Sequence, residues 1–267
     1  MANNPKGTAL VTGASTGIGA VYADRLAHRG HDLILVARDA ARMQAIAERL
    51  RASTGRGIEV LPADLTNRAD LAHVEGRLAG DATITTLVNN AGVSLKGGLL
   101  ENGSDVLEKL IALNITAPTV LAAAAAKAFF RRKTGAIINI SSVLALAPEA
   151  LEGVYSGSKA YLLNLSLKLV LDVKAAGVRV QAVLPGATRT EIWSRSGKDV
   201  DAILPGKVME VDDLVDAALV GFDRGELVTI PPLDESLWTA YNEARLALGP
   251  HLSRREVADR YREKAAA

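Results

Sequence analysis

The chain has 267 residues, of which 49% are hydrophobic and 4% aromatic, and its formal net charge is +1. This length suits one large domain, and the near-neutral charge argues against nucleic-acid binding, which usually needs a basic surface. The chain has no cysteine, which excludes disulfides and thiolate metal sites. Its four histidines are scattered without metal-ligand spacing, so we expect no metal.

No run reaches the ~18 consecutive apolar residues of a membrane span. The longest candidate, residues 117–130, is interrupted by Pro118 and Lys127. The first seven residues lack the apolar core of a signal peptide. We therefore expect a soluble, cytoplasmic protein without a membrane partner.

Apolar runs with strand character alternate with amphipathic runs along the first 230 residues. The predicted strands span 9–11, 33–37, 58–61, 86–89, 135–141, 178–184 and 227–230. The predicted helices span 20–28, 40–52, 68–78, 105–130, 154–176 and 212–222. This alternation predicts an α/β fold, a Rossmann-type doubly wound parallel sheet of about seven strands with helices on both faces.

We expect a single dinucleotide-binding and catalytic domain over residues 1–232 and a helical extension over 233–267. The extension predicts two helices, 234–248 and 254–264, divided by Gly249-Pro250, with Ser253 and Glu256 forming a capping box for the second. An apolar stripe on the extension comprises Leu233, Leu237, Trp238, Tyr241 and Leu246. Such a stripe needs a partner, so we expect the extension to pack on the domain or on a neighbouring subunit.

A glycine-rich stretch, Thr12-Gly13-Ala14-Ser15-Thr16-Gly17-Ile18-Gly19, joins the first predicted strand to the first helix. Glycines allow a tight turn and a close approach of the backbone, and a helix start attracts anions, so the stretch predicts a phosphate site. Its spacing is not the Gly-x-Gly-x-x-Gly of the common dinucleotide fingerprint. Alone it therefore leaves open a turn that only packs a helix on the sheet.

Several polar or turn-forming residues stand just past the ends of predicted strands. They are Arg38, Asp64, Asn90, Ser142 and Pro185. In a doubly wound sheet, ligands bind beyond the carboxyl ends of the strands, where the glycine-rich stretch also lies. We therefore expect these residues to share one site.

The residues after the second strand indicate the cofactor. An NAD site usually has an acid there, but this chain has Ala37 followed by Arg38, and a guanidinium suits the 2′-phosphate of NADP. Asp39 fits better as the N-cap of the next helix than as a ribose ligand. Asp64 suits an adenine contact or a turn, and the residues alone leave both open.

Tyr155 and Lys159 stand four positions apart in a predicted helix and therefore point to the same face. A tyrosine with an ordinary pKa near ~10 is a poor acid or base at neutral pH, and a nearby ammonium lowers that pKa. Ser142 lies thirteen positions before Tyr155 at the expected ligand edge. The three residues together predict general acid–base chemistry.

Taken together, these motifs resemble the short-chain dehydrogenase/reductase family, from Thr8 to about Pro232. The resemblance is carried by Thr12-Gly13-x-x-x-Gly17-Ile18-Gly19, Asp64-Leu65, Asn89-Asn90-Ala91-Gly92, Asn114, Ser142, Tyr155-x-x-x-Lys159 and Pro185-Gly186-x-x-x-Thr190. It implies that Tyr155 is the general acid or base and that Lys159 lowers its pKa and holds the nicotinamide ribose. It also implies that Ser142 orients the substrate oxygen and that Asn114 anchors a proton-relay water.

The resemblance further implies a cofactor site. Its expected residues are Gly13, Ser15, Thr16, Gly17, Ile18, Gly19, Arg38, Asp64, Leu65, Asn90, Ala91, Gly92, Tyr155, Lys159, Pro185, Gly186, Thr188 and Thr190. Many NADP-dependent relatives carry a basic residue where this chain has Thr16. NADP (as NADPH in reduction) is the expected cofactor, and NAD stays open.

The implied reaction passes hydride between the nicotinamide and a carbonyl or alcohol carbon of a small molecule. We expect residues 187–209 to form a lid over the substrate, with Val93, Leu144, Leu151, Ile192 and Trp193 as candidate contacts. The alternatives are a 3-oxoacyl-carrier reductase, whose acidic partner would dock on residues 131–133, and a non-catalytic NADP-binding regulator. The basic run 131–133 equally suits a helix C-terminus. In relatives, the helices that match 105–130 and 154–176 build a dimer, so the resemblance implies a homodimer or homotetramer.

Overall fold

A computed structural model describes residues 6–150 and 153–262. It divides the chain into two compact units, Met1–Pro231 and Pro232–Ala267, which are described separately here. The predicted contact Leu151 lies outside the described residues.

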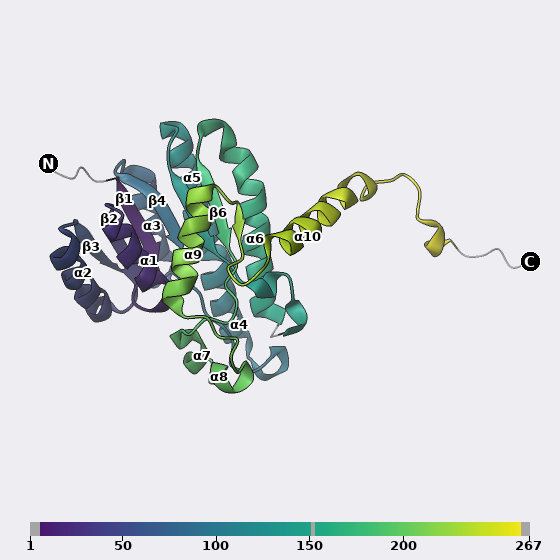
Figure 1. Cartoon of the computed structure of the whole chain (residues 1–267), viewed down its shortest axis with the longest axis horizontal. Helices are drawn as coiled ribbons and strands as arrows, with labels where there is room; N and C mark the ends of the chain where they lie inside the picture. The colour runs from purple at the N-terminus through teal and green to yellow at the C-terminus, as the bar shows by residue number, and fades with distance from the viewer. Residues whose placement is uncertain (1–5, 151–152, 263–267) are drawn as a thin grey trace, which may run out of the picture. The chain divides into compact units, whose positions relative to one another are not determined.

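The first unit is built on a seven-stranded parallel sheet (Figure 1). Its strands are β1 (Thr8–Thr12), β2 (Asp32–Ala37), β3 (Ile58–Pro62), β4 (Ile84–Asn89), β5 (Ala136–Ile140), β6 (Arg179–Val183) and β7 (Val228–Thr229). Their order is β3-β2-β1-β4-β5-β6-β7, so the chain reverses its direction of travel between β1 and β4. The predicted doubly wound α/β fold is confirmed, and its switch point lies beside the glycine-rich stretch.

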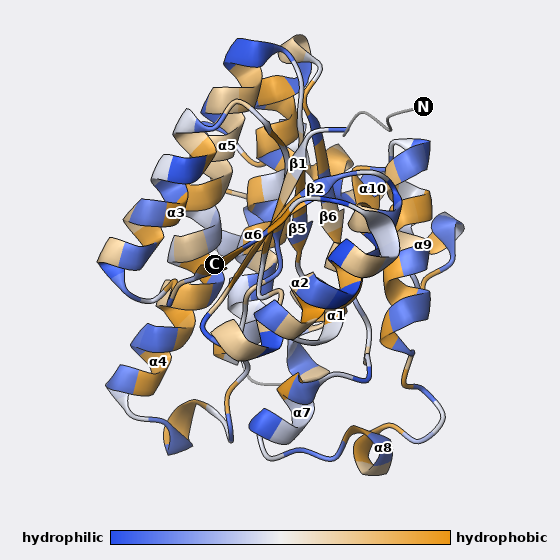
Figure 2. Ribbon diagram, turned by 90° about the vertical axis from the view of Figure 1, so that its left-hand side faces the viewer, coloured by the Kyte–Doolittle hydropathy of each residue, from blue (hydrophilic) through white to orange (hydrophobic). Residues whose placement is uncertain are grey.

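Helices cover both faces of this sheet. They are α1 (Gly17–His28), α2 (Ala40–Thr54), α3 (Arg68–Gly80), α4 (Ser104–Ile111), α5 (Ala117–Arg132), α6 (Gly153–Val173) and α9 (Val211–Arg224). On one face α1 packs against α2 and α9, and on the other α5 packs against α3 and α6. Figure 2 shows apolar residues in the strands and on the inward sides of the helices.

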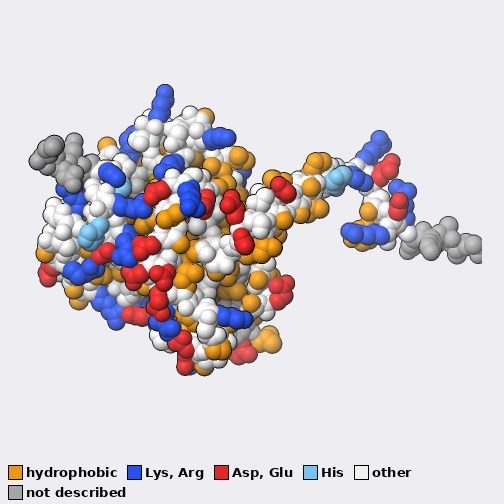
Figure 3. All heavy atoms as spheres, viewed as in Figure 1, with side chains coloured by type: hydrophobic (Ala, Val, Ile, Leu, Met, Phe, Trp, Pro, Cys, Tyr) orange, Lys and Arg blue, Asp and Glu red, His pale blue; other side chains and the backbone are white. Residues whose placement is uncertain are grey.

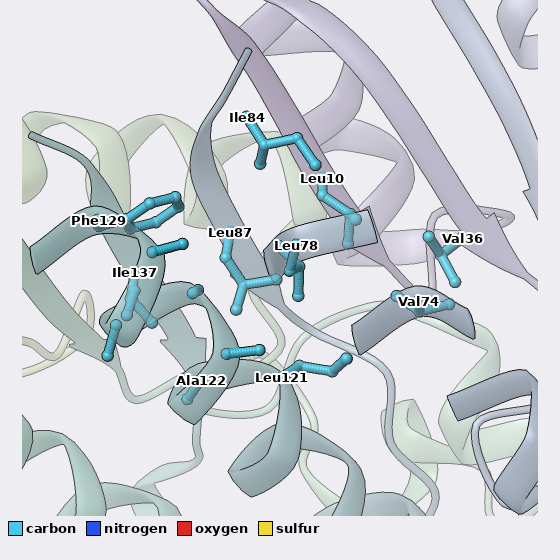
Figure 4. Packing of buried hydrophobic residues seen from close by; sticks show 14 of the residues in the cluster. Leu10, Val36, Val74, Leu78, Ile84, Leu87, Leu121, Ala122, Phe129 and Ile137 are labelled. Carbon is cyan, nitrogen blue, oxygen red and sulfur yellow. The ribbon is translucent and has the colours of Figure 1, made fainter. Parts of the chain in front are cut away.

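The core on the α3 and α5 face consists of aliphatic side chains from strands and helices (Figure 4). Leu10 and Leu87 project from neighbouring strands, and they meet Val74 and Leu78 of α3 and Leu121 of α5. All five side chains are fully buried. This dense burial of aliphatic surface, rather than of aromatic rings, holds the sheet and the helices together.

The predicted helix 105–130 is one helical stretch with an interruption. A π-helical turn, Ala112–Thr116, separates α4 from α5, and Asn114 is buried within it. By length and composition, Ser104–Arg132 is apolar enough to cross a membrane, but half of its most apolar window is buried inside the protein. Burial of this kind is typical of a core helix in a soluble fold.

The end of α5 is tied to the sheet by Arg132. Its guanidinium donates to the main-chain oxygen of Ile84 at 2.6 Å and lies 5.3 Å from the ring centroid of Phe129. Lys133 ends the helix with a left-handed backbone, φ 55°. On the face shown in Figure 3, basic and acidic side chains are interspersed.

The expected lid has two short helices, α7 (Glu191–Arg195) and α8 (Val200–Ile203). Its two ends meet in a parallel bridge between Thr188 and Met209. Arg189 forms ion pairs with Asp201 in the lid and with Glu210 just beyond it.

The second unit contains α10 (Glu235–Leu248) and two 3₁₀ turns, Gly249–His251 and Asp259–Tyr261. The predicted helix over 254–264 is wrong for its described part, because residues 254–258 form bends and coil and only 259–261 turn. A segment of this length is marginal as a helix unless its apolar side packs on something. The side chains of 254–262 are all exposed, so local propensity and the Ser253 capping box had no packing to support them.

Candidate active site

The glycine-rich stretch forms the turn between β1 and α1. The helix begins at Gly17, three residues earlier than predicted, and its N-cap Thr16 makes no side-chain capping bond. Without a side-chain cap, the first N–H groups of α1 can bind an anion. Gly13 and Gly17 have positive φ values of 65° and 54°, which favour glycine.

Asn90, at the end of β4, braces this turn from the other side of the switch point. Its side-chain nitrogen donates to the main-chain oxygens of Thr12 at 2.9 Å and Gly13 at 3.2 Å. A Cβ on Gly19 would lie 2.4 Å from that nitrogen and 2.3 Å from the oxygen of Gly13. Gly19 is therefore required by close packing against Asn90, and Asn90 shapes the loop whatever else it binds.

The cationic end of the site follows β2. Arg38 is exposed there, and Asp39 accepts a hydrogen bond from the main-chain nitrogen of Arg42 at 3.0 Å. The prediction that Asp39 caps the next helix is confirmed. Asp64 accepts from both the backbone and the hydroxyl of Thr66, so it is a turn residue in this structure. Its pKa is lowered: burial opposes the charged form, but the Thr66 hydrogen bonds and the charge of Arg38 outweigh it. The neighbouring Leu65 is buried.

Lys159 is buried beside the carboxyl end of β5. It is 5% exposed, and its amine donates to the main-chain oxygen of Ile140 at 3.0 Å. Burial lowers the pKa of this lysine to about 8. Because this pKa is still above 7, most of the amine is protonated at pH 7. The amine lies 5.6 Å from the ring centroid of Tyr155, one helical turn earlier on the same face of α6.

Ser142 lies at the end of β5, on the same edge of the sheet. It is 7% exposed, and its hydroxyl accepts from the main-chain nitrogen of Leu144 at 3.2 Å. The preceding Ser141 donates to the main-chain oxygen of Lys159 at 2.7 Å. This bond ties the end of β5, and with it Ser142, to the helix that carries Tyr155.

The side-chain amide of Asn114 is hydrogen-bonded to Val93 and Ser158. The amide accepts from the backbone nitrogen of Val93, and it donates to the backbone oxygen of Val93 and to the hydroxyl of Ser158. A Cβ on Gly92 would lie 3.3 Å from this amide oxygen and 3.4 Å from the Lys159 amine. The structure thus brings Asn114, Gly92 and Lys159 together.

A buried polar chain beneath the site was missed by the sequence analysis. Asn89 donates to the side-chain oxygen of Asn139 at 3.0 Å, and Asn139 donates to the hydroxyl of Ser166 at 2.8 Å. Asn139 is fully buried and stands between isoleucines in β5. A polar residue within an apolar strand was the available signal, because buried amides need partners.

The segment after β6 reaches the glycine-rich turn. Pro185 is buried and Gly186 half-buried, and the hydroxyl of Thr188 donates to the main-chain oxygen of Gly186 at 3.0 Å. Thr190 lies against the first turn of α1, since a Cβ on Gly17 would be 3.3 Å from its methyl group.

The candidate substrate contacts are half-buried where they are described. Val93, Leu144, Ile192 and Trp193 all have this intermediate exposure. The indole nitrogen of Trp193 donates to the main-chain oxygen of Thr188 at 2.9 Å, which fixes the ring in the lid. In the described parts of the chain there is no cluster of His, Asp and Glu suited to a metal ion.

Comparisons with known proteins identify the family to which the sequence is similar. The family model described as "short chain dehydrogenase" matches residues 7–201. A curated relative, human 17-beta-hydroxysteroid dehydrogenase type 3, is 36% identical over 68% of this chain. That match spans 59% of the human protein, less than two thirds of its length.

Two solved structures cover almost the whole chain. A short-chain dehydrogenase from Sphingobium yanoikuyae in complex with NADPH is 55% identical, with a TM-score of 0.92, and covers 96% of this chain and 100% of its own. A bulky-bulky ketone specific alcohol dehydrogenase from Comamonas testosteroni is 46% identical, with a TM-score of 0.88, and covers 96% of this chain and 98% of its own.

Proposed function

Because the chain belongs to the short chain dehydrogenase family, we propose that it is an NADP(H)-dependent oxidoreductase that acts on a carbonyl/alcohol pair. The observation that carries this proposal is the buried Lys159 amine, 5.6 Å from the ring centroid of Tyr155. Burying a charged lysine is energetically unfavourable, and such lysines with a shifted pKa are concentrated at functional sites.

The residues around the switch point fit a dinucleotide. The start of α1 lacks a side-chain cap, and the positive φ of Gly13 and Gly17 lets the backbone approach a pyrophosphate closely. The exposed guanidinium of Arg38 suits the 2′-phosphate of NADP. Asn90, Ala91, Gly92, Pro185, Gly186, Thr188 and Thr190 would line the remaining length of the cofactor.

The bound nicotinamide supplies or accepts the hydride. Tyr155 donates the proton to the carbonyl oxygen during reduction and accepts it during oxidation. The Lys159 ammonium, 5.6 Å from the ring centroid of Tyr155, favours the phenolate form over the neutral phenol. The hydroxyl of Ser142 donates to the substrate oxygen and holds it facing Tyr155.

We propose a ketone with two bulky substituents as the substrate. The Comamonas testosteroni protein, which covers nearly the same length, is described as specific for bulky-bulky ketones. Here Val93, Leu144, Ile192 and Trp193 are apolar and half-buried, and they would contact such substituents. We further propose a homo-oligomer located in the cytoplasm. The apolar side chains Ile111, Phe130 and Tyr161 are exposed on α4, α5 and α6 and would supply surface for its assembly.

The carrier-reductase alternative keeps two of its three basic residues exposed, Arg131 and Lys133. It depends on a basic run at 131–133, but Arg132 is bonded to the main-chain oxygen of Ile84. The guanidinium therefore already has a structural role.

The test is turnover of NADPH and of NADH against ketones of graded bulk, with Tyr155→Phe as the inactive comparison. We expect oxidation of NADPH with diaryl or aryl-alkyl ketones and a lower rate with small ketones. Tight NADPH binding without turnover of any ketone or alcohol would instead favour a non-catalytic regulator. Cofactor that stays bound and is not consumed while substrate changes would favour an epimerase or dehydratase.

A further inference from the structure

An ion pair joins the lid to α2, the helix that follows β2 and Arg38. Arg42, in the first turn of α2, donates through Nη1 to both carboxylate oxygens of Glu191, at 2.9 and 3.0 Å. Glu191 is the first residue of α7, 149 positions along the chain. The contact therefore connects two segments that are far apart in the sequence.

Each member of this pair has a second charged partner. Arg195 donates to Glu191 from one turn later in α7 at 2.5 Å, and Asp39 lies 3.3 Å from Nε of Arg42. The Arg42 hydrogen bond, with Arg195 nearby, lowers the pKa of Glu191 and keeps it ionised. The pair is thus permanently charged at physiological pH, although both side chains are close to half exposed.

The position of the pair relates it to the cofactor. Thr190, next to Glu191, packs on Gly17 of the glycine-rich turn. Arg42 follows Arg38 by four residues and stands in the first turn of α2. The pair therefore links the lid to the segment that carries Arg38, beside the proposed cofactor site.

We propose that Arg42 and Glu191 form a clasp that holds the lid over bound NADP(H) and slows its release. This inference rests on the proposed cofactor site and makes Arg42 and Glu191 positioning residues. The clasp adds a contact between the lid and α2 and must open before the cofactor leaves.

Replacing Glu191 distinguishes the clasp from a simple charge effect on NADP(H) binding. NADP(H) is an anion, so removing a nearby negative charge should by Coulomb's law alone tighten its binding. The clasp predicts the opposite sign, because Glu191→Gln frees the lid. An exposed ion pair is modest in strength, so we expect NADPH to dissociate about threefold to fivefold faster.

The experiment measures NADPH release from the full-length protein by stopped-flow fluorescence during displacement with excess NADP⁺. The matched control is Asp201→Asn, which also removes a lid acid paired with an arginine but leaves the contact with α2 intact. We expect release from this control to be unchanged or slower. Glu191→Gln should have no further effect when Arg42→Gln is already present.

Three results would overturn the clasp. They are slower or unchanged release from Glu191→Gln, equal acceleration by Asp201→Asn, and an undiminished effect of Glu191→Gln in the Arg42→Gln background. Failure of the wild-type protein to bind NADPH would instead contradict the proposed function itself. Thermal unfolding of each variant checks that the comparison is made between folded proteins.

Discussion

Lys159 donates its buried amine to the main-chain oxygen of Ile140, the last residue of β5. The bond, 3.0 Å long, joins the middle of the sheet to the helix that carries Tyr155. A charged amine is thereby held in a protein interior that does not favour it. Function and stability are expected to conflict at this residue.

We predict that Lys159→Met abolishes turnover and makes the protein more stable at pH 7. The lysine pKa falls from 10.5 to about 8 on folding, so below pH 8 the folded state bears the full cost of burying the charge. Allowing for the lost bond to Ile140, the gain should be on the order of 2 kcal/mol. Between pH 8 and 10.5 the unfolded chain binds more protons, so wild-type stability rises with pH and the advantage of the variant disappears.

Urea unfolding of both proteins at pH 7 and at pH 10 measures this difference. Lys168→Met is the matched control, because Lys168 is exposed on the same helix and pairs with Asp172. We expect the control to change stability by less than about 0.5 kcal/mol. A Lys159→Met protein less stable than the wild type at pH 7 would contradict the predicted burial cost.

Tyr155→Phe should lower kcat by about 10²-fold to 10⁴-fold, because it removes the group that exchanges the proton. NADPH binding should change little, since the ring and the lysine beside it remain. Tyr161→Phe provides the comparison: Tyr161 lies on the same helix, and its hydroxyl bonds Thr119 on the surface. Steady-state kinetics with the best ketone decides the matter, and equal losses in the two variants would remove Tyr155 from the chemistry.

Two glycine-to-alanine changes should have opposite signs. Gly19→Ala places a methyl 2.3 Å from the oxygen of Gly13 and 2.4 Å from Asn90, so it should destabilise the protein by more than about 2 kcal/mol and weaken NADPH binding. Gly76→Ala, within α3, meets nothing within 4 Å and should stabilise by about 0.5–1 kcal/mol. Thermal melting and NADPH titration test both variants. A Gly19→Ala protein with normal stability would show that the turn relaxes more than its packing indicates.

Arg38→Ala should remove most of the preference for NADP. Charge-assisted hydrogen bonds to a phosphate are strong, so KM for NADPH should rise about tenfold or more while KM for NADH stays nearly constant. Arg68→Ala, an exposed arginine at the start of α3, serves as the control. The specificity argument fails if the wild type prefers NADH or if both cofactors weaken equally.

The regular parts of the fold were predictable because their signals are local. Each strand is an apolar run that ends at a polar or turn residue, and the parallel sheet follows from the alternation with helices. The π-helical turn at Asn114 was not predictable, since its amide bonds Val93 and Ser158, which are distant in sequence. The predicted tail helix failed for the converse reason: its local signal, the Ser253 and Glu256 capping box, was present, but the side chains of 254–262 are exposed.

The two edges of the sheet bear on how this chain behaves at high concentration. One edge strand, β7, has two residues and is followed by Pro231-Pro232, which have no N–H to donate. The opposite edge, β3, carries the charged Glu59 and ends at Pro62. Short, charged or proline-limited edges resist the addition of strands from other molecules. The chain should therefore refold from denaturant with little intermolecular β-aggregation, even though it is rich in aliphatic residues.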